Sequence, residues 1–102
     1  MEEKVYTDYI FTDPADREFR GEFKDGFKAE KIPEGLCSIT IRDHDIGRTL
    51  YKLDVQTYKL VGSGEIALPI QDMLFKVLWL DGRPEERARM ILDIETSKKF
   101  EA

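Results

Sequence analysis

The sequence is short of the residues on which most metal, redox and nucleophilic chemistry depends. Its 102 residues contain one cysteine, Cys37, and one histidine, His44. A single cysteine cannot form an internal disulfide, and one cysteine with one histidine cannot supply the usual ligands of a structural zinc site. The composition therefore predicts a protein that folds without a disulfide and carries no metal or other cofactor.

Positive charge is also in deficit, because 21 acidic residues outnumber 16 basic ones and give a formal net charge of −5. Nucleic acids and anionic membrane surfaces are bound through basic patches, and the sequence holds no basic cluster of useful size. We expect neither a nucleic-acid partner nor a membrane partner.

Long hydrophobic runs are missing as well. The longest apolar run, 73–80, is interrupted by Lys76 and falls far short of the roughly 20 residues that a membrane-spanning helix needs. The first residues lack the basic segment and the apolar core of a secretory signal peptide, so a cytoplasmic location is expected. The length fits a single domain over residues 1–102.

Alternating hydrophobicity predicts strands in the first half of the chain. Residues 4–12 are rich in aromatic and β-branched types, which favour extended structure. Residues 36–43 alternate most regularly, with Ile39 and Ile41 on the face that is expected to be buried.

Two further strands are expected before the chain becomes helical. Residues 49–61 are predicted as one long strand with a bulge near Gln56 or Thr57, because the apolar positions change frame there. A glycine-rich turn then precedes a short strand over 65–68.

Residues 14–24 fit two patterns. Asp13 is a good helix cap, and phenylalanines recur at a spacing of four. Residues 19–23 also alternate as a strand does, and Asp25-Gly26 is typical of a hairpin turn. The spacing of four is the stronger pattern, and we expect a helix over 14–24.

The hydrophobic period changes to that of a helix after Pro69. The apolar residues that match the helical template are Ile70, Met73, Leu74, Val77 and Leu78. Asp81-Gly82 supplies a C-terminal stop. A second helix is predicted over 84–100, with acidic residues first and basic residues last, although alternation over 88–96 also permits a strand.

These elements together predict an α+β fold. It would consist of an antiparallel sheet of about four strands with helices segregated to one side, including a C-terminal helical pair. The alternative is a mostly-β sandwich, in which 74–81 and 88–96 form a hairpin.

The densest polar cluster is Asp43-His44-Asp45, which lies in the Arg42–Arg48 loop. Histidine transfers protons near neutral pH, and a flanking carboxylate can orient its ring. Successive residues of an extended chain point apart, however, and Asp and His are common in turns. We interpret the cluster as a solvated turn and keep catalysis by His44, Asp43 and Asp45 as the second hypothesis.

Phe75 and Trp79 are four residues apart on the predicted helix, roughly opposite the centre of its main apolar stripe. They are expected to stack on one another. Either the following segment covers them through Met90 or Ile91, or they remain exposed and bind a partner.

No catalytic constellation stands out, so the sequence favours a protein that is not an enzyme. We expect a small protein-interaction module, acting as an adaptor, regulator or inhibitor, that binds another protein or a second copy through Phe75 and Trp79. One alternative is a small enzyme or ligand-binding domain that uses the Arg42–Arg48 loop. A further alternative is a structural subunit of a larger assembly, such as a phage particle.

Overall fold

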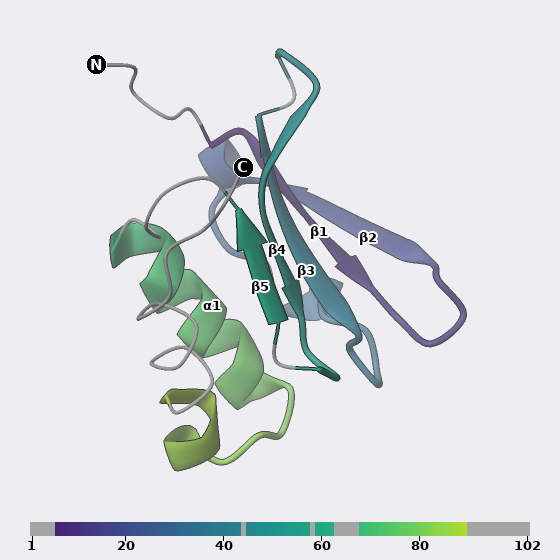
Figure 1. Cartoon of the computed structure of the whole chain (residues 1–102), viewed down its shortest axis with the longest axis vertical. Helices are drawn as coiled ribbons and strands as arrows, with labels where there is room; N and C mark the ends of the chain where they lie inside the picture. Colours follow the sequence, from purple (N-terminus) through teal and green to yellow (C-terminus); the bar gives the residue numbers. More distant parts are fainter. Residues whose placement is uncertain (1–5, 44, 58, 63–67, 90–102) are drawn as a thin grey trace.

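The computed structural model describes residues 6–43, 45–57, 59–62 and 68–89, which form an antiparallel sheet and a helix packed against it (Figure 1). The sheet has five strands in the order β2-β1-β3-β4-β5. Their bounds are β1 Asp8–Thr12, β2 Glu18–Glu22, β3 Ser38–Asp43, β4 Arg48–Asp54 and β5 Lys59–Gly62. The long helix is α1, Leu68–Leu80, and the 3-10 turns η1, Phe23–Asp25, and η2, Ala29–Lys31, follow β2.

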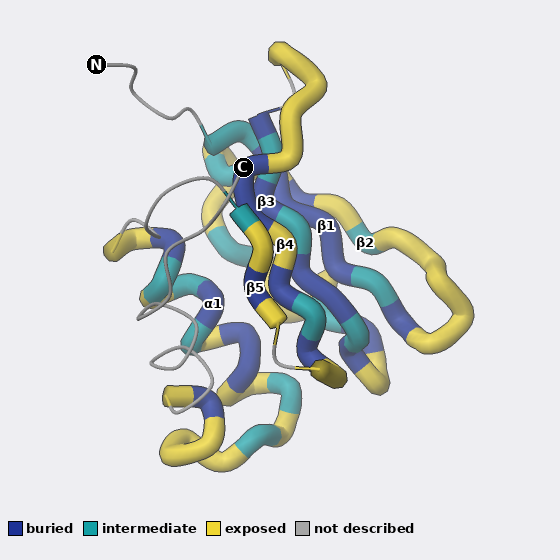
Figure 2. Tube along the Cα trace, viewed as in Figure 1, coloured by how far each residue is buried: buried dark blue, intermediate teal, exposed yellow. Residues whose placement is uncertain are grey.

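The core lies between α1 and one face of the sheet. On this face, paired residues form two rows that cross all five strands. One row is Gly21, Tyr9, Ile41, Tyr51 and Gly62, and the other is Phe19, Phe11, Ile39, Leu53 and Leu60. Helix α1 contributes the buried side chains Ile70, Leu74, Val77 and Leu78 to the same cluster. Figure 2 shows the burial concentrated in the central strands and along one side of α1.

The ring of Tyr9 lies across Gly21, its partner in β2. A Cβ atom at Gly21 would come within 2.3 Å of the Tyr9 ring and hydroxyl, so only glycine fits there. The Tyr9 hydroxyl donates to the Gly26 carbonyl at 3.3 Å and accepts from the Lys28 backbone N–H at 3.0 Å. One side chain of β1 therefore fixes both the edge strand and the loop that follows it.

The opposite edge of the sheet repeats this packing. Tyr51 is fully buried and lies opposite Gly62, where a Cβ atom would come within 2.5 Å of its ring. Tyr6 stacks on Tyr51 with ring centroids 6.3 Å apart and meets Phe23 edge-on at 6.4 Å. Aromatic contacts thus connect the two edges across the core face.

The α+β prediction is confirmed, but the expected number of strands is too low by one. The predicted helix over 69–80 is present as α1, so the sandwich with a strand over 74–81 is wrong. Residues 85–89 are helical, and the rest of the predicted helix 84–100 lies outside the described residues.

The helix predicted over 14–24 is wrong, because this segment contains β2. Asp13 accepts the backbone N–H groups of Ala15 and Arg17 at 3.0 and 2.9 Å and so closes a tight turn. Asp16 adopts a left-handed conformation (φ 62°) that a helix cannot contain. Beyond this turn, the packing of Tyr9 on Gly21 holds the chain as a strand.

The single long strand predicted over 49–61 is also wrong, since a turn separates β4 from β5. The Asp54 carboxylate accepts the backbone N–H groups of Gln56 and Thr57 at 2.9 and 3.0 Å. This side-chain bonding reverses the chain, and the change of apolar frame marks a turn rather than a bulge. The strand predicted over 65–68 lies largely outside the described residues, and Leu68 begins α1.

Within the part of the chain that the structure describes, no helix has both the length and the apolar character needed to cross a bilayer.

We predict that Gly21→Ala destabilises the protein by about 2 kcal/mol or more, because the new methyl group must displace the buried Tyr9 ring. Chemical denaturation measures the change. The neighbouring control, Arg20→Ala, removes an exposed side chain of the same strand and should change stability by less than about 0.5 kcal/mol. Equal effects of the two substitutions would contradict the proposed packing.

A second prediction concerns Asp13 and pH. The backbone N–H of Arg17 is the main cause that lowers the pKa of Asp13 from 3.8, against the opposing effect of burial. A lowered pKa stabilises the fold above the unfolded value and loses that contribution as the pH falls through the folded value. Asp13→Asn should therefore melt below the wild type at pH 7, and the two melting temperatures should converge below about pH 3.8. A constant difference across this range would rule out the charge as the cause.

Candidate functional site

Helix α1 is fixed on its inner side and at its C-terminal end. Leu74, Val77 and Leu78 are completely buried. After Leu80 the chain closes a Schellman cap, in which Arg83 N–H bonds to Leu78 C=O at 3.3 Å and Gly82 N–H bonds to Trp79 C=O at 3.2 Å. Gly82 has the left-handed conformation that this cap requires (φ 91°).

Asp81 and Arg83 form an ion pair within this cap. The Asp81 carboxylate lies 3.8 Å from Arg83 Nε. Burial raises the pKa of Asp81, while the nearby Arg83 opposes the rise. The end of α1 is therefore held by polar contacts as well as by the core.

A second apolar line runs along the outer side of α1. Leu68, Phe75 and Trp79 are separated by seven and four residues, which places them within about 40° of one another at 100° per residue. The exposed fraction is 72% for Leu68 and 52% for Trp79, whereas Phe75 is half-buried. We call these three residues the outer stripe. It extends for about 16 Å along the helix.

The described part of the segment after α1, residues 81–89, contacts the outer stripe at its middle residue. The Arg89 guanidinium lies over the Phe75 ring, 4.4 Å from its centroid, and Arg89 Nε is 3.5 Å from Glu85. Ala88, next to it, is fully buried in the core cluster. The covering residues that the sequence suggested, Met90 and Ile91, lie outside the described part.

The stacking predicted between Phe75 and Trp79 is not among the ring contacts of the described residues. Arg89 occupies a face of Phe75 instead. Trp79 remains half exposed beside Leu80, which is 44% exposed. Large apolar side chains that remain exposed on a well-packed helix are typical of contact surfaces.

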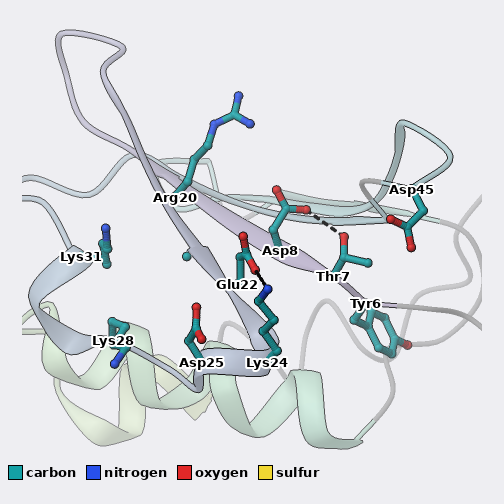
Figure 3. A pocket seen from close by; sticks show the side chains of 11 residues that line it. Tyr6, Thr7, Asp8, Arg20, Glu22, Lys24, Asp25, Lys28, Lys31 and Asp45 are labelled. Carbon is teal, nitrogen blue, oxygen red and sulfur yellow. Dashed lines mark hydrogen bonds and ion pairs between the residues drawn. The ribbon is translucent and has the colours of Figure 1, made fainter.

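An open groove of about 720 Å³ lies beside the β2 edge (Figure 3). Tyr6, Thr7 and Asp8 of the β1 side line it together with residues of β2, η1 and η2. Asp45, from the loop between β3 and β4, lies at one end in Figure 3, and Lys28 and Lys31 lie at the other.

Charges in the groove largely compensate one another. Its acidic residues are Asp8, Glu22, Asp25 and Asp45, and its basic residues are Arg20, Lys24, Lys28 and Lys31. Lys24 Nζ is 3.1 Å from Glu22, which raises the pKa of Lys24 away from neutrality. Arg20 is paired with Glu18 at 2.9 Å. This balance provides no concentrated anion site, and the raised pKa of Lys24 makes that residue unsuited to proton transfer near pH 7.

The Arg42–Arg48 loop is built as a turn at its beginning. Asp43 is buried and accepts the backbone N–H of Asp45 at 3.1 Å. Asp45 is exposed and points into the groove, while His44 lies outside the described residues. The structure therefore assigns a turn-forming contact to Asp43 and leaves the catalytic hypothesis for His44, Asp43 and Asp45 a prediction.

No metal cluster is formed by the described residues. They contain no group of three or more His, Cys, Asp or Glu side chains placed to hold a metal ion. Cys37 is half-buried just before β3, and its thiol donates to the Gly35 carbonyl at 3.3 Å.

Comparison with protein-family models, with curated proteins and with solved structures finds no match for this chain. The function is therefore argued from geometry and chemistry alone.

The sequence does not predict the place of two residues, one on the outer side of α1 and one that packs against it from residues 85–89. Leu68 was assigned to a preceding strand, although its spacing of seven from Phe75 matches the helical period. Arg89 gave no local sign that it would cover Phe75, because that contact depends on the turn between α1 and residues 85–89.

We predict that Trp79→Ala lowers the folding stability by no more than about 1 kcal/mol, because half of the side chain is already in water. Leu74→Ala, one turn earlier on the buried side, should cost about 2–5 kcal/mol. Thermal and chemical denaturation of both variants provide the measurement. A loss at Trp79 as large as that at Leu74 would show that Trp79 belongs to the core.

Proposed function

We propose that this protein is a non-catalytic interaction module that binds another protein through the outer stripe of α1. The observation that carries the proposal is the half-exposed Trp79, held at the rigid C-terminal end of an otherwise well-packed helix. Tryptophan is among the residues that contribute most to binding at protein interfaces.

The anchoring of α1 supports the same function. A side chain that is already positioned loses little conformational freedom on binding, and this improves affinity. Buried residues and the Schellman cap hold the helix backbone around Trp79. The stripe can therefore meet a partner without a prior folding step.

A ligand-binding function is a second candidate, favoured by one observation: Asp45 of the Arg42–Arg48 loop lines the groove. Because the charges in that groove compensate one another, they support ligand binding less strongly than the exposed Trp79 supports protein binding. The proposed setting of the interaction is the cytoplasm, which the single cysteine favours.

We predict that Trp79→Ser removes a bound partner, because truncation of a central tryptophan commonly costs about 2 kcal/mol or roughly 30-fold in Kd. Affinity capture compares the wild type with Trp79→Ser and with the control Val61→Ser. Val61 is 50% exposed but lies on β5. Each captured protein is then added stepwise to this chain while the emission of Trp79, the only tryptophan of the chain, is recorded.

The expected result is capture by the wild type and by Val61→Ser, loss with Trp79→Ser, and a blue shift of the emission on binding. Partners that bind all three proteins equally, without a change in emission, would contradict the proposal.

A further inference from the structure

The two charged residues of α1 lie on one side of the outer stripe. Asp72 and Lys76 are exposed and lie on the same side of it, about 40° and 80° from Leu68 on the helical wheel. The other side presents the uncharged Gln71. In the described part of the chain, neither Asp72 nor Lys76 belongs to an ion pair.

This pattern is complementary to itself when two copies of α1 pack in opposite directions. A two-fold axis that reverses the helix direction places the same side of the stripe from both copies together. If Leu68 of one copy packs on Trp79 of the other, on either side of the central Phe75 that Arg89 covers, Asp72 of each copy lies next to Lys76 of its partner. The symmetry makes this charge pair twice.

The parallel arrangement has no such complementarity. It would bring Leu68 against Leu68 and Trp79 against Trp79. Asp72 would then face the side that carries Gln71, where α1 has no charged residue to oppose it.

The edge of β2 offers a poorer route to self-association. Its outward side chains, Glu18, Arg20 and Glu22, are all charged and exposed, which is a common protection of edge strands against pairing. The outer stripe therefore presents the better self-complementary surface.

We propose that the partner of the outer stripe is a second copy of this chain, bound through antiparallel packing of the two α1 helices with two Asp72–Lys76 ion pairs. The inference rests on the proposed function and names its partner. A contact between two helices of this length buries less than a standard interface, so the dimer should be reversible, with a Kd weaker than about 1 µM.

Sedimentation equilibrium of the full chain, from about 1 to 500 µM, measures this association. The wild type and the control Val61→Ser should form dimers with the same Kd, and Trp79→Ser should remain monomeric. Trp79 emission of the wild type should move to the blue over the same concentration range. A monomer throughout, or a dimer that Trp79→Ser leaves unchanged, would overturn the proposal.

Charge reversal tests the antiparallel geometry. Asp72→Lys alone places lysine opposite Lys76, and Lys76→Asp alone places aspartate opposite Asp72, so each should weaken the dimer about tenfold. The double variant should regain the wild-type Kd, and an equimolar mixture of the two single variants should form a mixed dimer. Circular dichroism establishes that all variants remain folded. Failure of both the double variant and the mixture to associate would overturn the arrangement.

The dimer and the proposed function fail in different ways. A chain that remains monomeric at every concentration, yet captures a different protein only when Trp79 is present, overturns the dimer and leaves the interaction module in place. A monomer whose captured proteins do not depend on Trp79 overturns both.

Discussion

The position of Tyr9 over Gly21 determines much of this structure. The ring occupies the space that any larger residue at position 21 would need. Its edges contact Phe11, Phe23 and Phe27, with centroids 5.1, 5.3 and 6.5 Å away. The hydroxyl binds backbone groups at Gly26 and Lys28, which are close in space but distant from Tyr9 in sequence. The edge strand, the aromatic cluster and the loop beside the groove therefore all depend on one side chain.

The contacts of Tyr9 also explain which part of the fold could be predicted. The regular alternation in β3 and the helical period in α1 arise from local patterns that place apolar residues on one face, and both elements were predicted correctly. The pattern around Phe19 is compatible with a helix and with a strand. The choice between them is made by the packing of Tyr9 on Gly21, a contact between strands that no local pattern contains. The turn after β4 could have been predicted from local sequence, because an aspartate such as Asp54 commonly accepts the backbone N–H groups of the residues that follow it, here Gln56 and Thr57.

Helical periodicity alone predicted two of the α1 residues that form the candidate site, but not which residues cover them. Periodicity placed Phe75 and Trp79 away from the core. Trp79 is half exposed, whereas Phe75 is half-buried and packs against the core cluster. Periodicity could not show that Arg89 covers Phe75, since that contact requires the chain to turn after α1 and return. The polar cluster around His44 drew attention because of its composition. Its described members serve a turn and the rim of a groove, and both roles are ordinary for aspartates in a loop.

Exposure of an aromatic side chain usually has one of two causes, a loosely held segment or a surface that is kept ready for contact. The cap after α1 argues for the second cause here. The Trp79 carbonyl accepts the Gly82 N–H, the Leu78 carbonyl accepts the Arg83 N–H, and the Leu78 side chain is completely buried. The backbone at Trp79 is thus restrained by the cap and by the buried side of the helix, while about half of its side chain remains exposed to water. A fold that anchors this residue so firmly, yet buries only half of it, keeps an apolar surface in a fixed orientation, which is the physical requirement for binding with little loss of entropy.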